Sequence, residues 1–307
     1  MGAGLHGKNG LNPTTSLHIF HTYVLPVLTY GLEILLPDKK QLDNIEVFYR
    51  KSLKQILSMP TNTADVAIYT LAGVIPIIGT IHKSALNTFN KICNMDSSVE
   101  KDLADILDNP YSKERWKSIV KKAVDNYYRA QTTSSARLYS SLRFLSTNNL
   151  LWNRPHPSLA SVNTSSQDIS RLPTKLKLLT GTYYLQSNKA AFNQNTVDPT
   201  CLLCKGKPET IDHFLMECPA LHEIRSPYLQ ELDNFIGSID VCMKCSIHSN
   251  ITLDTNFILD PSSFICACGC MDFCYTVEYI TRKLCFALHG LRSRIIKNLP
   301  PSKRKGL

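Results

Sequence analysis

The chain has 307 residues, of which 43% are apolar and 19% are charged, and this composition excludes a wholly disordered protein. Its length suffices for one large domain or two modest ones with hydrophobic cores of their own. The formal net charge of +9 is compatible with a nucleic-acid partner, but an ordinary basic soluble protein carries a similar excess.

The sequence predicts no targeting or membrane-spanning segment. Residues 1–12 are polar and glycine-rich, unlike a signal peptide. The most apolar stretch, 23–36, is broken by Pro26, Gly31 and Glu33 and is too short to span a bilayer. We therefore expect an intracellular protein, nuclear or cytoplasmic. In such a protein the 11 cysteines are interpreted as thiols or metal ligands in preference to disulfides.

The first half of the chain predicts a series of helices. Residues 14–36 form an apolar helical pattern that Pro26 and Gly31 interrupt. Asp38, with Gln41 three residues later, has the pattern of a capping box before a helix that Pro60 closes. Further helices are predicted over 63–72, with Thr63 as cap and Gly73 as stop, and over 76–92, 102–107 and 113–128.

Residues 113–143 hold eight basic and two acidic residues, with four interleaved aromatic residues. Such a stretch suits phosphate contacts combined with stacking on bases or sugars. An amphipathic helix with a solvated basic face explains the same pattern. The candidate nucleic-acid-binding residues are Lys113, Arg115, Lys117, Lys121, Lys122 and Arg129, together with Lys175 and Lys177 further along the chain.

The segment 154–167 is rich in Pro, Ser and Asn and lacks periodicity, which predicts a linker. It separates a helical region, 1–153, from a second unit, 168–236, and residues 237–307 follow as a Cys-rich loop, a C-terminal helix and a basic tail. Within these parts, helices are predicted over 172–185, 228–236 and 264–297, and an irregular loop over 242–262. Because no strand pattern stands out, the predicted fold class is mainly α.

The most informative motif is Cys201-x2-Cys204-x8-His213-x4-Cys218. Zinc prefers four tetrahedral sulfur or nitrogen ligands, and four protein ligands define a closed structural site with no position for a catalytic water. We expect His213 and Cys218 to reach the same ion from a helix that begins near Asp212, which is a candidate cap. The motif predicts one structural Zn²⁺, which would stabilise a unit too small to fold by burial alone.

A second group of cysteines lies between Cys242 and Cys274, and includes Cys245, Cys266, Cys268 and Cys270. Its spacing matches no compact zinc pattern, and alternate positions of a helix do not face one ion. Reduced structural thiols are the simpler interpretation, and a second metal site stays open.

Three stretches of the chain resemble LINE-type (non-LTR) retrotransposon reverse transcriptases. They are residues 4–11 with 23–33, the Cys201 to Cys218 motif with Pro219 and Ala220, and residues 285–292. The resemblance implies a helical, thumb-like bundle from the region after the polymerase palm, followed by a small zinc-knuckle unit and a C-terminal helix. It also implies Cys201, Cys204, His213 and Cys218 as ligands, and RNA or DNA, or other parts of a retrotransposon ribonucleoprotein, as partners.

The chain departs from this family in one respect, which predicts a protein without polymerase activity of its own. Polymerase chemistry needs carboxylates that hold two metal ions, and no Asp-Asp pair occurs in the sequence. The expected function is that of a nucleic-acid-binding remnant of a reverse transcriptase. The alternative is a zinc-stabilised module that contacts proteins through apolar helices between Leu17 and Ile92. A hydrolase is the least supported interpretation, because no hydrolase or nucleotide-binding motif is present.

Overall fold

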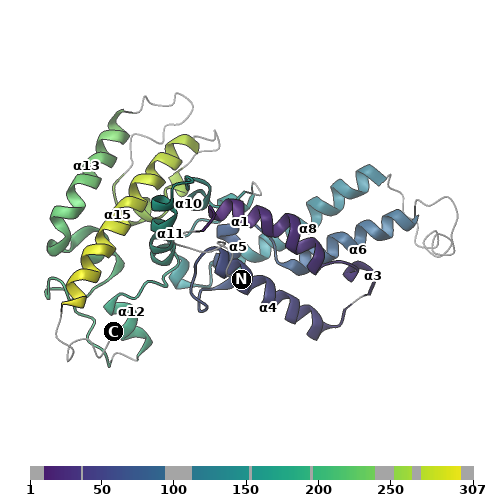
Figure 1. Ribbon diagram of the computed structural model, residues 1–307, viewed down its shortest axis with the longest axis horizontal. Coiled ribbons are helices and arrows are strands. Elements are labelled where there is room, and N and C mark those ends of the chain that lie inside the picture. Colours follow the sequence, from purple (N-terminus) through teal and green to yellow (C-terminus); the bar gives the residue numbers. More distant parts are fainter. Residues whose placement is uncertain are drawn as a thin grey trace.

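Figure 1 presents the computed structural model of the chain, which describes residues 10–35, 37–93, 113–151, 154–193, 196–238, 252–264 and 271–298. Within these ranges the secondary structure consists of helices and of one isolated bridge between Thr200 and Pro208. The expectation of a mainly α fold is therefore confirmed. The expected helix at 102–107, the basic tail and most of the second cysteine group lie outside the described residues.

The N-terminal apolar stretch folds into short helical pieces. These are α1 (Pro13–Ile19), the π-helical turn η2 (Phe20–Val24), α2 (Leu25–Leu28) and α3 (Leu32–Leu35). Pro26 lies in the first turn of α2, where a missing N–H is tolerated. Gly31 separates α2 from α3 with a positive φ of 76°, as predicted. The predicted interruption at Pro26 is wrong, because the backbone stays helical from Pro13 to Leu28 and only changes from π to α geometry before the proline.

The next three helices are α4 (Lys39–Ile56), α5 (Asp65–Ala72) and α6 (Ile77–Cys93). The capping box at the start of α4 is confirmed, since Asp38 and Gln41 each bind the other's backbone N–H. The predicted cap of α5 is wrong, because Ala64 occupies that position and no side chain caps it. Gly73 ends α5 in the left-handed conformation, as predicted.

Helix α8 (Lys113–Ala136) extends beyond the predicted range 113–128 and packs antiparallel to α6, forming the arm at the right of Figure 1. Asp125 is buried in this contact, where it pairs with Lys83 of α6 at 2.8 Å and with Arg129 at 3.5 Å. The two helices of the arm are thus joined by a buried ionic contact.

The expectation that 154–167 is a linker is wrong. This segment contains α10 (Pro157–Ala160) and is buried at His156, Ser158 and Leu159. Its polar groups find partners far away in sequence, such as Asp260 for His156 and Glu278 for Ser158. The short η3 (Ser140–Leu142) and α9 (Asn148–Leu151) lead into it.

The C-terminal half is organised around α15 (Met271–Lys297), which packs on α11 (Ser166–Leu179) and α13 (His222–Ser238). Between α11 and α13 lie α12 (Gln186–Phe192), the π-helical turn η4 (His213–Glu217) and η5 (Pro219–Leu221). The expected irregular loop contains α14 (Thr255–Leu259), which is buried and is followed by η7 (Pro261–Phe264).

The predicted division into separate units is not visible in the hydrophobic core. One buried cluster runs from Leu17 and Tyr49 through Leu159 and Leu176 to Leu288. It also includes Cys201 and Cys218, so the cysteine motif is built into the main core. Among the described residues, no individual helix combines the length and apolar character required of a membrane span.

Candidate metal centre

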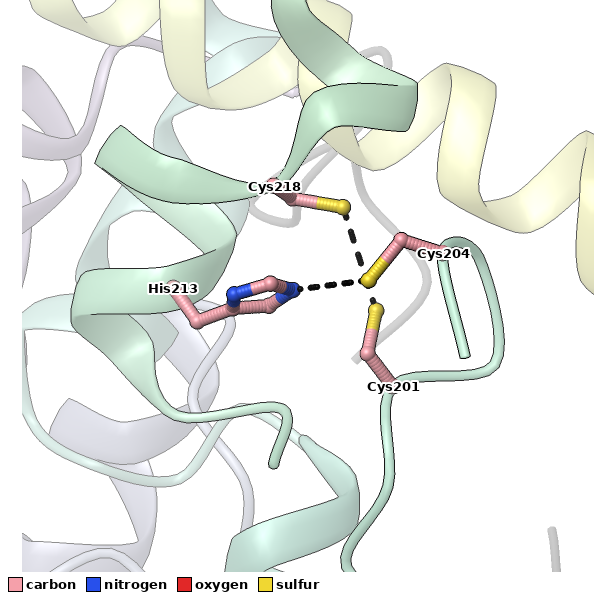
Figure 2. A group of neighbouring side chains, drawn as sticks. All are labelled: Cys201, Cys204, His213 and Cys218. Atoms are coloured by element: carbon pink, nitrogen blue, oxygen red, sulfur yellow. Dashed lines mark hydrogen bonds between the residues drawn. The ribbon is translucent and has the colours of Figure 1, made fainter. Parts of the chain in front are cut away.

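Four predicted ligands come together from two short segments, as Figure 2 shows. Cys201 and Cys204 lie in a tight loop, in which Lys205 N donates to Cys201 O at 2.9 Å. Lys205 adopts a positive φ of 58°, so the backbone turns sharply here. We call residues 200–210 the cysteine loop.

The other two ligands lie at the two ends of η4, a π-helical turn that begins at His213 and is followed directly by Cys218. In an α-helix, two residues five apart point about 140° away from each other. Here Cys218 N donates to His213 O at 2.7 Å, an i→i+5 hydrogen bond that brings the two side chains to one face. The sequence spacing that an α-helix could not use is thus accommodated by a π turn.

The distances within the cluster suit one tetrahedral ion. Its four ligand atoms all lie within 4.8 Å of one another. The Sγ atoms of Cys201 and Cys218 are 3.9 Å apart, and Cys204 Sγ lies 3.3 Å from His213 Nε2. A tetrahedral ion with metal–sulfur bonds of about 2.3 Å sets its sulfur atoms about 3.8 Å apart and a sulfur and a nitrogen about 3.6 Å apart.

Electrostatics around the thiols differ between the ligands. Burial, followed by the charge of Cys201, raises the pKa of the Cys218 thiol to about 12. At Cys204, burial raises the thiol pKa, but donation from the backbone N–H groups of Gly206 and Lys207 outweighs it and the net pKa is lowered. Burial lowers the pKa of His213 and favours the neutral imidazole that a metal requires. Buried thiols with raised pKa values are stabilised as thiolates when a cation binds.

Neighbouring side chains hold the ligand segments in place. Arg225 of α13 is buried and donates to the carbonyls of Met216 and Cys218, at 2.5 and 2.8 Å. His213 turns its Nδ1 toward Glu217, 3.9 Å away, and no hydrogen-bond partner within the described residues satisfies that nitrogen. The predicted cap is wrong: Asp212 caps nothing and pairs with Arg143 instead, while Thr210 Oγ1 accepts from His213 N.

Glu209 anchors the cysteine loop to the rest of the fold. Its side chain is fully buried and accepts from Arg292 Nε and Nη2, each at 2.7 Å. It also accepts from Gln186 N at the start of α12, at 2.9 Å. No local signal in the sequence identifies Glu209, Arg225 and Arg292, because their partners are set by tertiary packing.

The candidate nucleic-acid-binding residues have different surroundings. Lys117, Lys121 and Lys122 are exposed on α8. Arg129 is mostly buried and pairs with Asp125. Lys177 is half-buried, and the side chains of Lys113 and Arg115 lie outside the described residues.

The expectation for Lys175 is contradicted. This lysine is fully buried, and its Nζ lies 2.5 Å from Glu278 Oε2 and 2.5 Å from Thr281 Oγ1. A buried ammonium ion must be paired, and this one is paired with a carboxylate of α15. Lys175 therefore stabilises the core and cannot reach a phosphate on the surface.

A second group of possible metal-binding side chains surrounds this lysine. It consists of His156, Asp260 and Glu278, all buried. Lys175 already provides the positive charge beside Glu278, and His156 Nε2 lies 3.1 Å from Asp260 Oδ2. The Ser158 hydroxyl donates to Glu278 Oε1, and only the Ser158 backbone N–H donates to His156 Nδ1, so this serine hydroxyl is not paired with the histidine as a nucleophile with its base.

Comparison with known proteins finds no protein family, no curated protein and no solved structure that matches this chain.

Proposed function

We propose that this chain is a nucleic-acid-binding protein that binds RNA or a primer–template duplex, with one structural zinc ion built into its core. We further propose that it derives from the thumb and zinc-binding region of a LINE-type reverse transcriptase. The binding part of the proposal rests on one observation, the exposed row of Lys117, Lys121 and Lys122 on α8. Asp125 is the only carboxylate among the described side chains of that helix, and it is buried. The exposed face is therefore positive, which favours phosphate contacts.

Zinc is the metal that the donor set favours. Three thiolates and one imidazole are soft or borderline donors, which select zinc over magnesium or calcium. All four positions belong to the protein, so the ion is expected to fix the fold rather than to activate water. Cys201 and Cys218 lie in the main hydrophobic core, and loss of the ion is therefore expected to weaken packing well beyond the cysteine loop.

We also propose that the protein does not catalyse polymerisation. The sequence holds no Asp-Asp pair for two catalytic metal ions. The thumb-like bundle and the zinc knuckle are parts of the same proposal, supported by the helical arm of α6 and α8 and by the four convergent ligands.

The experiment that tests the binding proposal measures the affinity of the full chain for labelled RNA and for duplex DNA over a series of salt concentrations. We expect affinity to fall steeply with salt, because phosphate contacts release counterions. EDTA treatment combined with Cys218→Ser is expected to weaken RNA binding. Cys93→Ser is the matched control, since Cys93 is a half-buried thiol on α6 outside the metal centre. Absence of binding to either nucleic acid at low salt would overturn the proposal.

A protein-interaction module is the second candidate, and an exposed apolar surface favours it. Several large apolar side chains between η2 and α3 are exposed, among them Val27 at 78%, Tyr30 at 87% and Leu35 at 75%. Exposed apolar patches of this kind mark partner surfaces. This candidate predicts no salt-dependent RNA binding, and the same titration therefore separates the two.

A further inference from the structure

A cavity of about 680 Å³ lies between α12, the C-terminal turns of α15 and the turn that follows α11. Figure 1 shows α12 close to the C-terminal end of α15. The cavity is separate from the four metal ligands and from α8, so neither the metal centre nor the lysine row on α8 accounts for it.

The cavity walls combine exposed aromatic rings with positive charge. Tyr184 and Phe192 line it and are 64% and 88% exposed. Lys189 and Lys297 line it as well, and no acidic residue is among the described residues of its wall. Asn193 adds an amide group. Exposed aromatic rings beside lysines and amides form the type of surface on which unpaired bases stack while phosphates meet cations.

Arg292 is a third cationic side chain in the cavity wall. Burial, followed by the nearby charge of Arg292, lowers the pKa of Lys189. Arg292 is held by Glu209 and also donates to Tyr184 O at 3.0 Å. The same arginine therefore connects the cysteine loop to the backbone beside one of the two aromatic rings, so the cavity wall is fixed by the fold around the metal centre.

We propose that this cavity binds one or two unpaired nucleotides of a single-stranded nucleic acid, with bases stacked on Tyr184 and Phe192 and phosphates next to Lys189 and Lys297. The inference rests on the proposed nucleic-acid-binding function and adds a specific subsite to it. An acidic peptide would satisfy the lysines but leaves the aromatic rings without stacking partners, so the observations favour a nucleotide strand.

The test uses the full zinc-loaded chain and a fluorescent oligouridylate that contains one 4-thiouridine. Anisotropy titrations compare the wild type with a Tyr184→Ala/Phe192→Ala double variant. The matched control is Tyr23→Ala/Tyr30→Ala, which removes two aromatic rings that are 68% and 87% exposed on η2 and in the turn after α2, outside the cavity wall. Because all four rings are largely exposed, these variants should keep their thermal unfolding midpoint, which is measured for each.

We expect the Tyr184/Phe192 double variant to bind at least about tenfold more weakly, since each base–aromatic stack strengthens binding by roughly that factor or more. The control should bind like the wild type. Ultraviolet crosslinking followed by mass spectrometry should place the 4-thiouridine adduct within residues 184–193. Competition with excess uridine monophosphate shows whether the cavity prefers a free nucleotide or a strand. If it prefers a strand, the monophosphate should compete only weakly.

Two results overturn the inference in distinguishable ways. If the wild type binds but the double variant binds equally well and the adduct lies elsewhere, the cavity inference fails while the proposed function stands. If the wild type binds no oligonucleotide and a polyglutamate peptide binds instead, both fail.

Discussion

Arg292 donates to both carboxylate oxygens of Glu209 across 83 residues of sequence, with both atom pairs 2.7 Å apart and Glu209 fully buried. This bidentate pair ties the cysteine loop to α15, the helix around which the C-terminal half is packed. The metal centre and the core are therefore expected to unfold together.

Removal of the arginine from this pair should be costly. In an Arg292→Met variant, Glu209 would remain buried without its partner, and we expect a loss of about 3–5 kcal/mol in the free energy of unfolding. Urea denaturation of the zinc-loaded protein measures it. Lys207→Met is the control, because Lys207 and Glu217 are 68% and 49% exposed and their pair should contribute less than about 1 kcal/mol. Equal losses in the two variants would contradict this account.

Stability should depend on pH through His156 and Asp260. Burial alone would lower the pKa of His156, but the charge and hydrogen bond of Asp260, followed by the charge of Glu278, raise it above 6.5. Burial alone would raise the pKa of Asp260, but His156 and other hydrogen bonds lower it below 3.8. The stabilisation that His156 gives the fold is complete below pH 6.5 and is lost as the pH rises through the pKa of the folded state. The stabilisation that Asp260 gives is complete above pH 3.8 and is lost as the pH falls through the pKa of the folded state.

The pair should therefore stabilise the fold most between pH 3.8 and 6.5. Urea midpoints measured across pH for the wild type and for Asp260→Asn check this. The variant should lose the stability that the ion pair adds in that window. Once the carboxylate is gone, burial favours the neutral form of His156. A constant difference between the two proteins across the whole pH range would refute the prediction.

Two glycines should respond in opposite ways to alanine. Gly73 has a φ of 68°, and a Cβ placed there would lie 2.1 Å from the carbonyl oxygen of Arg154. Gly73→Ala should thus destabilise the protein by more than about 1 kcal/mol. Gly290, inside α15, has nothing within 4 Å of such a Cβ, and Gly290→Ala should stabilise it by up to about 1 kcal/mol. Thermal unfolding of both variants gives the comparison.

The lysine row on α8 should set the salt dependence of RNA binding. Lys117→Gln/Lys121→Gln removes two of its charges and should reduce the slope of log affinity against log salt by about 1.4 for a single strand. Lys40→Gln/Lys51→Gln changes the net charge equally at two exposed positions of α4. That control should leave the slope close to the wild-type value; an equal reduction in both would indicate a nonspecific effect of net charge.

Local signals in the sequence predicted much of the fold. The capping box of Asp38 and Gln41 and the left-handed end at Gly73 depend on residues within a few positions of one another. Several helix bounds were less accurate. Helix α11 begins at Ser166 rather than at 172 and includes Pro173, a residue that normally indicates a break. Ser165 caps its start, and this cap was not predicted because Ser165 lies in the segment expected to be a linker.

The residues that were misassigned depend on contacts distant in sequence. Lysine is a residue type usually found on the surface. Lys175 can be buried because it pairs with Glu278, 103 residues later. His156 lies in a stretch that looks like a linker, and Asp260 satisfies it from 104 residues away. The four metal ligands could be predicted because their spacing is compact, whereas the π turn that aligns His213 with Cys218 could not.

We propose that Cys201, Cys204, His213 and Cys218 hold one zinc ion. Metal analysis of the purified chain, combined with X-ray absorption at the zinc edge, measures both the amount of metal and its neighbours. We predict about one zinc per chain with three sulfur neighbours and one nitrogen neighbour, and loss of the metal in Cys218→Ser but not in Cys93→Ser. A wild-type chain that is folded, with reduced thiols, and holds no zinc would contradict the account.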